Sequence, residues 1–252
     1  MRTTIDCAGV RLAGYLARPA ATSGGPGIVR HGLVVCHGFP SGPGGRATAG
    51  RTYPQLADRV AADAGWVVLT FNFRGTGESE GDFSLGGWVD DLRCAVDHLL
   101  EVTDVDRVWL AGFSTGGSLA LCAAAEDERV GGVAAFSAPA DFDAWSSDPR
   151  RFLAACRAAG LVQDTSFPPS LEAWARELHE IRPLALIGKV PPRSVLLVHG
   201  SNDDVVSPMD ARALADAADG RVELRVLTGA GGRLRHDPRA VAVLLGWLDR
   251  QS

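Results

Sequence analysis

The sequence predicts an α/β protein whose central sheet is mostly parallel and covered by helices on both faces. From Leu33 onward, short runs rich in β-branched residues alternate with longer runs whose apolar residues recur at helical spacing. The strand runs are almost continuously hydrophobic, as is typical of strands buried on both sides. A glycine-flanked turn at residues 112–116 joins one of these runs to a helical run. We therefore expect one α/β domain spanning residues 1–252.

Six runs are predicted to form the parallel strands, at residues 33–36, 66–71, 107–111, 132–136, 194–198 and 222–227. Before them, residues 3–6 and 10–17 form two short alternating runs on either side of Ala8-Gly9. This pattern is typical of an antiparallel hairpin. We expect the hairpin to lie at one edge of the sheet.

Helices are predicted over residues 88–99 and 241–248, because their apolar residues repeat at helical spacing. Two helix starts can also be identified. Ser207 and Asp237 each precede a proline, which places an N-cap residue before a proline at the first helical position. We expect helices to begin directly after these two residues.

Residues 138–193 interrupt the alternation, since they contain no clear strand. Helical stretches at 150–159 and 171–181 are separated by Phe-Pro-Pro at 167–169. A structureless loop of this length is uncommon in a compact domain. We therefore predict a small helical cap inserted at about residues 138–193. Its aromatic residues either line an apolar substrate pocket or pack the cap on the core, and they are Phe142, Trp145, Phe152, Phe167 and Trp174.

Composition excludes several classes of partner. The chain has 252 residues and a formal net charge of −5, and its acidic and basic residues are interspersed. It has neither a basic stripe for nucleic acid nor a polybasic patch for a membrane surface. Residues 1–6 lack the apolar core of a signal peptide, and no apolar run reaches the roughly 18 residues of a membrane span. We expect a cytoplasmic protein that binds a small molecule.

Cysteine usage indicates structural thiols. Five cysteines are scattered through the chain, mostly inside apolar runs, and they are Cys7, Cys36, Cys94, Cys122 and Cys156. No pair has redox or metal-ligand spacing, so we expect all five to be reduced. No cluster of His, Cys, Asp and Glu has metal-ligand spacing either. Residues 74–77, Arg-Gly-Thr-Gly, lack the helix and acidic partner of a dinucleotide fingerprint. We expect no metal and no cofactor.

Four segments resemble signatures of the α/β-hydrolase family, and they follow the family's order. They are residues 34–40 (Val-Val-Cys-His-Gly-Phe-Pro), 71–79 (Phe-Asn-Phe-Arg-Gly-Thr-Gly-Glu-Ser), 112–116 (Gly-Phe-Ser-Thr-Gly) and 198–203 (Val-His-Gly-Ser-Asn-Asp). Each segment is modest evidence alone, but four in order are specific. The resemblance covers nearly the whole chain. It implies an α/β-hydrolase fold similar to that of serine esterases and dienelactone hydrolases.

The resemblance also implies roles for individual residues. Ser114 would be the nucleophile on a strained turn, and the backbone N–H groups of Phe39 and Thr115 would form the oxyanion hole. The alternative for Ser114 is an ordinary helix N-cap. Asp203 matches the position of the triad acid, with its neighbour Asp204 as the competing carboxylate.

The histidine of the triad is where the chain departs from the family. In the family it lies in the loop after the last strand, and the matching position here is Gly232. His37 and His199 resemble structural positions rather than the base. His236 is the natural substitute, but four extended residues can displace it by up to about 13 Å. The alternative is a solvent-facing or helix-flanking histidine beside the arginines at 233 and 235.

Two functions are consistent with this pattern. The first is a serine hydrolase that cleaves carboxylic esters, or related thioesters or amides, through an acyl-enzyme on Ser114. Its activity would be impaired because Gly232 supplies no imidazole. The second is a protein of the same fold that binds a ligand without turning it over. Since the fold hosts many chemistries, it does not identify the substrate.

Overall fold

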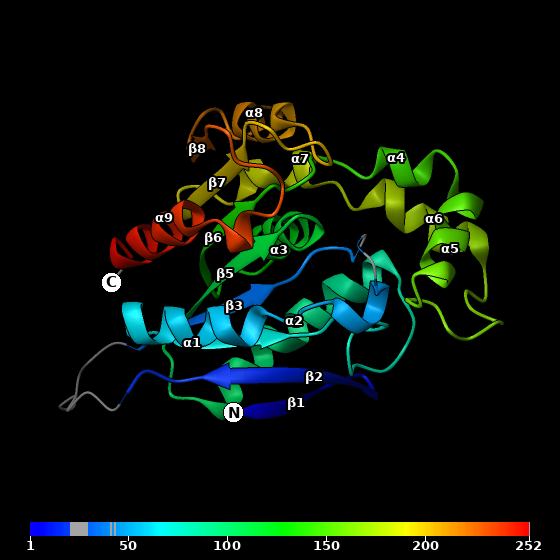
Figure 1. Ribbon diagram of the computed structural model, residues 1–252, viewed down its shortest axis with the longest axis horizontal. Coiled ribbons are helices and arrows are strands. Elements are labelled where there is room, and N and C mark those ends of the chain that lie inside the picture. The colour runs from blue at the N-terminus through cyan, green and yellow to red at the C-terminus, as the bar shows by residue number, and fades with distance from the viewer. Residues whose placement is uncertain (21–29, 41, 43, 252) are drawn as a thin grey trace.

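An eight-stranded sheet forms the centre of the structure, a computed structural model that describes residues 1–20, 30–40, 42 and 44–251 (Figure 1). The strand order is β1-β2-β4-β3-β5-β6-β7-β8. The strands are β1 (Arg2–Cys7), β2 (Val10–Ala17), β3 (His31–Cys36), β4 (Val67–Phe71), β5 (Arg107–Phe113), β6 (Val130–Phe136), β7 (Ser194–Gly200) and β8 (Glu223–Leu227). All six predicted parallel strands are present, so the predicted fold class is confirmed.

The first two strands form the predicted hairpin. β1 pairs antiparallel with β2, and β2 pairs antiparallel with β4. From β3 to β8 every neighbouring pair is parallel. The hairpin therefore lies at one edge of the sheet, as predicted.

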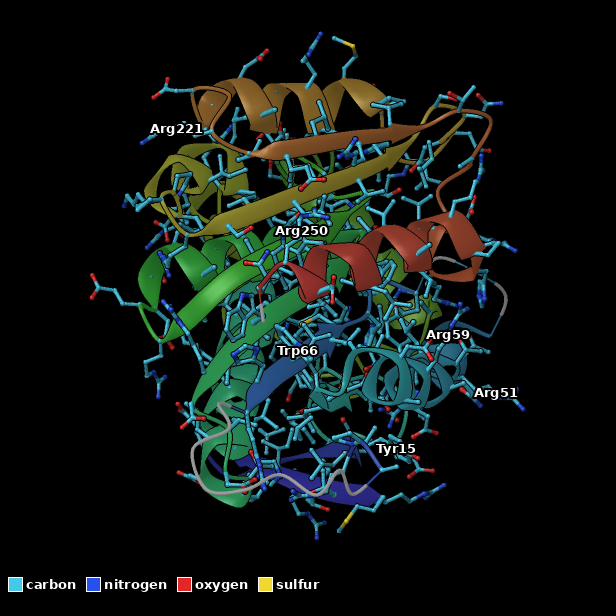
Figure 2. All side chains as sticks on the ribbon, turned by 90° about the vertical axis from the view of Figure 1, so that its left-hand side faces the viewer. Tyr15, Arg51, Arg59, Trp66, Arg221 and Arg250 are labelled. Carbon is cyan, nitrogen blue, oxygen red and sulfur yellow. A yellow bond between two sulfur atoms is a disulfide. The ribbon has the colours of Figure 1, made fainter. Side chains whose placement is uncertain are left out.

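Helices cover both faces of the twisted sheet (Figure 2). One apolar cluster joins the sheet to α1 (Tyr53–Ala64) and α9 (Pro238–Asp249). The cluster on the opposite face joins it to α2 (Leu85–Val102), α3 (Thr115–Glu126) and α8 (Pro208–Ala217). Burial on both faces is the reason why the strand sequences are so uniformly apolar.

Two helix starts follow the predicted capping. The side chain of Ser207 accepts a hydrogen bond from the N–H of Met209 at the start of α8. Asp237 accepts one from the N–H of Arg239 at the start of α9. Of the described helices, none is both long and apolar enough to cross a bilayer.

Between β6 and β7 the regular elements of the described chain are all helical. They are α4 (Asp143–Ser146), α5 (Pro149–Ala158), α6 (Leu171–Glu180), α7 (Pro183–Leu186) and the 3₁₀ turn η2 (Ile187–Lys189). Figure 1 shows α4, α5 and α6 grouped at one side of the molecule, toward which the arrow of β3 points. Two further 3₁₀ turns, η1 (Gly45–Thr48) and η3 (Leu234–His236), flank the site described below.

The aromatic residues of this helical segment pack on one another and on the core. The rings of Trp145 and Phe152 are stacked with centroids 4.4 Å apart, and Phe152 lies 5.5 Å from Phe39. The indole N–H of Trp174 donates to the carbonyl of Phe83 at 3.1 Å. Of the two roles expected for these residues, the structure shows packing of the segment on the core.

One expectation from the sequence is wrong: Cys7 and Cys94 form a disulfide. Cys7 ends the edge strand β1 and Cys94 lies in α2, with 5.6 Å between their Cα atoms. The two residues are 87 positions apart, so their spacing in the sequence carries no sign of the pairing. Cys36, Cys122 and Cys156 are free and buried, as expected for structural thiols.

Candidate functional site

Ser114 lies in a strained turn between β5 and α3. Its backbone angles are φ 51° and ψ −128°, a region that residues with a side chain rarely adopt. The two glycines that flank the turn are required because their backbones come very close together. A Cβ on Gly112 would lie 2.2 Å from the carbonyl oxygen of Gly116. Ser114 occupies the N-cap position, but its side chain makes no capping hydrogen bond. The hydroxyl is therefore not used as a helix cap.

The Ser114 side chain borders a cavity of about 640 Å³. The cavity lies at the carboxyl ends of β3, β5, β6 and β7, where α/β proteins place their ligands. The predicted site residues Phe39, Asp203, Gly232 and His236 all line it. The structure thus brings residues that are far apart in the sequence together around one cavity.

His37 holds the loop that approaches Ser114 from β3. One ring nitrogen, Nδ1, donates to the carbonyl of Gly38 at 2.8 Å, and the other accepts from the N–H of Phe73 at 3.2 Å. Burial lowers the pKa of His37 to about 4, so the ring is neutral. These bonds give His37 a structural role, as the sequence indicated.

The two backbone N–H groups expected to form an oxyanion hole belong to two segments that meet at Ser114. A Cβ on Gly38 would be 2.7 Å from the Cβ of Ser114, so the loop that carries Phe39 touches the turn directly. Thr115 is the first residue of α3, and the N–H of a first helical residue has no acceptor inside its own helix.

Asp203 follows β7 and its side chain is completely buried, whereas Asp204 is exposed. Its Oδ1 accepts hydrogen bonds from the N–H groups of Val205 and Val206, both at 3.0 Å. Its Oδ2 has no hydrogen-bond partner among the described residues. His199 Nε2 is 3.4 Å from this oxygen, but its hydrogen bond goes to the carbonyl of Val206 at 3.0 Å.

Gly232 lies directly against this carboxylate. A Cβ on Gly232 would be 2.6 Å from Oδ1 and 2.8 Å from Oδ2 of Asp203. Its backbone is not in the positive-φ region, so conformation alone does not require glycine here. Any larger residue would require Asp203 or the loop to shift. The position matched to the family's histidine thus points toward the acid but carries no imidazole.

His236 is engaged elsewhere. Its Nε2 accepts a hydrogen bond from Nε of Arg235 at 2.9 Å, and the residue is exposed in η3. Partial burial, with the charges of Arg235 and Arg233, lowers the pKa of His236. No hydrogen bond joins it to Ser114 or Asp203 within the described part of the chain. His236 therefore borders the cavity beside the arginines, without contacting the other predicted catalytic residues.

Two residues that line the cavity, Tyr53 and Ser137, were not predicted from the sequence. Both hydroxyls are buried and have no hydrogen-bond partner among the described residues. The guanidinium of Arg235 lies 5.3 Å from the centre of the Tyr53 ring. Ser137 directly follows β6, and this position after a parallel strand is the signal that would have identified it. Tyr53 has no comparable signal in the sequence.

Part of the chain is similar to known sequences. Residues 33–156 match the family model described as "alpha/beta hydrolase fold". The chain is 30% identical over 131 residues to an uncharacterized 31.7 kDa protein of Escherichia coli, and 31% identical over 134 residues to the quorum-quenching protein AidA of Acinetobacter baumannii. The matched regions cover 46% and 51% of this chain, but only 41% and 40% of those relatives.

Solved structures match over nearly the whole length. The α/β hydrolase GrgF from a Penicillium species gives a TM-score of 0.75 at 20% identity, with 99% of this chain and 98% of that chain covered. Est1E of Butyrivibrio proteoclasticus, solved with ferulic acid bound, gives 0.69 at 20% identity, covering 98% and 96%. The Pyrococcus furiosus esterase Pf2001 gives 0.69 at 19%, covering 100% and 90%. Together with the sheet order and the turn at Ser114, these matches identify this chain as an α/β-hydrolase-fold protein.

Proposed function

We propose that the protein is a serine hydrolase that cleaves carboxylic esters, or related thioesters or amides, through an acyl-enzyme on Ser114. The observation that carries this proposal is the strained backbone of Ser114, whose hydroxyl is not used as a cap and borders the same cavity as Asp203. Strain at a non-glycine residue costs about 1–3 kcal/mol and is characteristic of functional sites. The esterases among the structural neighbours are consistent with this chemistry.

In the proposed reaction, Ser114 Oγ attacks the ester carbonyl. The N–H groups of Phe39 and Thr115 stabilise the oxyanion, and water then releases the acid. Each such donor is worth about 3 kcal/mol where it has been measured.

Turnover is expected to be slow, because Gly232 has no imidazole and His236 Nε2 is bonded to Arg235. Loss of a triad histidine costs about 10⁶ in turnover where it has been measured, while an acceleration of about 10³–10⁴ over water remains. An activated ester is therefore the appropriate substrate for detecting the reaction.

The first test compares hydrolysis of p-nitrophenyl acetate by the wild type, Ser114→Ala and Ser147→Ala. Ser147 is an exposed serine in the helical segment between β6 and β7, so its substitution is the matched control. We expect activity above background in the wild type and Ser147→Ala, and none in Ser114→Ala. Equal hydrolysis by all three proteins would contradict the proposal.

The second candidate function is ligand binding without turnover. The hydrogen bond of His236 Nε2 to Arg235 instead of to Ser114, together with Gly232, favours it. It predicts that wild type and Ser114→Ala are equally inactive toward the ester and that Ser114 is not labelled by a fluorophosphonate. Labelling of Ser114 would exclude it, because labelling requires an activated hydroxyl.

A further inference from the structure

Three basic side chains from one short segment line the cavity that Ser114 borders. They lie between β8 and α9, and they are Arg233, Arg235 and His236. Within the described part of the chain, neither guanidinium forms an ion pair with a carboxylate. The carboxylates that line the same cavity, Asp203 and Asp204, are therefore not their partners. This wall of the cavity carries two positive charges that no carboxylate of the described chain contacts.

Arg235 is held at a fixed place in the cavity by contacts on one side of its guanidinium. The guanidinium lies 5.3 Å from the centre of the Tyr53 ring, and its Nε donates to Nε2 of His236 at 2.9 Å. The Tyr53 ring in turn packs against that of Phe113, the residue before Ser114, with 5.8 Å between their centroids. Nε is thus used within η3, whereas the terminal NH₂ groups have no carboxylate to bind among the described residues.

The other two side chains offer further hydrogen-bond donors. Because Nε2 of His236 accepts from Arg235, the neutral ring carries its proton on Nδ1, and the described residues supply no acceptor for this N–H. Partial burial and the charges of Arg235 and Arg233 lower the pKa of His236, so the ring is neutral at pH 7. Arg233 is exposed, and its side chain makes no hydrogen bond with the described residues. A ligand in the cavity therefore meets two guanidinium groups and one N–H group.

We propose that Arg233, Arg235 and His236 bind a phosphate group of the substrate while Ser114 attacks its ester. The inference rests on the proposed function and adds the substrate class: carboxylic esters or thioesters that also carry a phosphate. Guanidinium groups bind phosphate oxygens in pairs. A phosphate monoester has about 1.5–2 negative charges at pH 7 and three terminal oxygens, enough for all three groups. A carboxylate has one charge and two oxygens, so it matches them less well. The cavity of about 640 Å³ is large enough for a small substrate of this kind.

Three acetate esters of similar length test this substrate class. Their alcohols are 2-hydroxyethyl phosphate, 3-hydroxypropanoate and 2-methoxyethanol, so the esters differ in carrying a phosphate, a carboxylate or no charge. Binding to Ser114→Ala is measured by ligand-observed NMR at low ionic strength, where hydrolysis through Ser114 does not interfere. We expect the phosphate ester to bind at least about tenfold more tightly than the carboxylate ester, and the neutral ester to bind least tightly. Equal binding of all three, or tighter binding of the carboxylate ester, would overturn the inference.

Arginine variants in the same Ser114→Ala background locate the site. We expect Arg233→Gln and Arg235→Gln each to weaken binding of the phosphate ester at least about fivefold, because each removes a charged donor. Arg107→Gln is the matched control. Arg107 also lies over an aromatic ring, 5.8 Å from the centre of the Trp109 ring, but it begins β5 at the end of the strand opposite the cavity.

Two results with these variants would overturn the inference: unchanged binding in both cavity variants, or an equal loss in Arg107→Gln. Because Arg233 is exposed and its side chain makes no hydrogen bond with the described residues, Arg233→Gln should fold as the parent does. A fluorophosphonate on the wild type separates this inference from the proposed function. Phosphate-selective, arginine-dependent binding without labelling of Ser114 supports the phosphate site and contradicts the hydrolase. Labelling of Ser114 without phosphate selectivity does the reverse.

Discussion

Gly232 is closely packed against its surroundings, so position 232 is not simply a position from which a histidine is missing. Its α-carbon lies so close to Asp203 that even a methyl group would be 2.6–2.9 Å from the carboxylate. The carboxylate cannot move cheaply, because two backbone N–H groups hold Oδ1. For this reason we do not expect Gly232→His alone to restore a triad: the loop would have to move away from Asp203 before an imidazole fits.

Gly232→Ala and Gly231→Ala form a matched pair that tests this contact. We expect Gly232→Ala to lower the free energy of unfolding by about 1–3 kcal/mol, as overpacking does. Gly231→Ala has an open Cβ position and should change stability by no more than about 0.5 kcal/mol. Urea denaturation measures both. Equal stability of the two variants would show that Gly232 does not contact Asp203.

The strain at Ser114 predicts opposite effects on stability and chemistry. Ser114→Gly removes the penalty of a side chain at φ 51°, so we expect it to be more stable than wild type by about 1 kcal/mol. Ser114→Ala keeps the penalty and should not gain this stability. Neither variant should hydrolyse p-nitrophenyl acetate. If thermal unfolding shows Ser114→Gly to be the less stable of the two, the turn is not strained.

At the scale of elements, His37 connects the end of β3 to the segment after β4. Its Nε2 accepts from the N–H of Phe73, and its Nδ1–H donates to the carbonyl of Gly38. Protonation of the ring would remove the acceptor from Phe73. The position of the Phe39 loop, and hence of the proposed oxyanion hole, thus depends on a neutral His37.

A pH dependence of stability follows from this arrangement. Burial holds the pKa of His37 at about 4 in the folded protein, against about 6.5 when unfolded. The unfolded state therefore binds more protons, and the stability that the neutral ring provides is lost as pH falls from about 6.5 to 4. We expect wild type to lose about 2 kcal/mol more than His37→Asn between pH 7 and pH 5. Parallel pH profiles in urea denaturation would contradict this.

The disulfide between Cys7 and Cys94 ties the edge strand β1 to α2. Because it closes a loop of 87 residues, we expect reduction to lower the free energy of unfolding by about 2–4 kcal/mol. Urea denaturation with and without dithiothreitol measures this, with Cys7→Ser/Cys94→Ser as the control that should not respond. An identical midpoint for oxidised and reduced wild type would mean that the bond does not stabilise the fold.

At the scale of the whole molecule, the strands were predictable because burial on both faces makes each a continuous apolar run. Ser114 and Asp203 were predicted as site residues from the turn and the family motif, and both line the cavity. Other features depend on three-dimensional proximity and left no local pattern. Cys7 meets Cys94 only because β1 lies beside α2, and Tyr53 reaches the cavity only because α1 packs against the sheet. The hydrogen bond from Arg235 to His236 depends on the shape of η3.

Covalent labelling of the intact protein with a fluorophosphonate, followed by mass spectrometry and peptide mapping, tests whether Ser114 is the nucleophile. We predict a single adduct located on Ser114, and no adduct in Ser114→Ala. An unmodified wild-type protein, or an adduct at another residue that persists in Ser114→Ala, would contradict the assignment of Ser114 as the nucleophile.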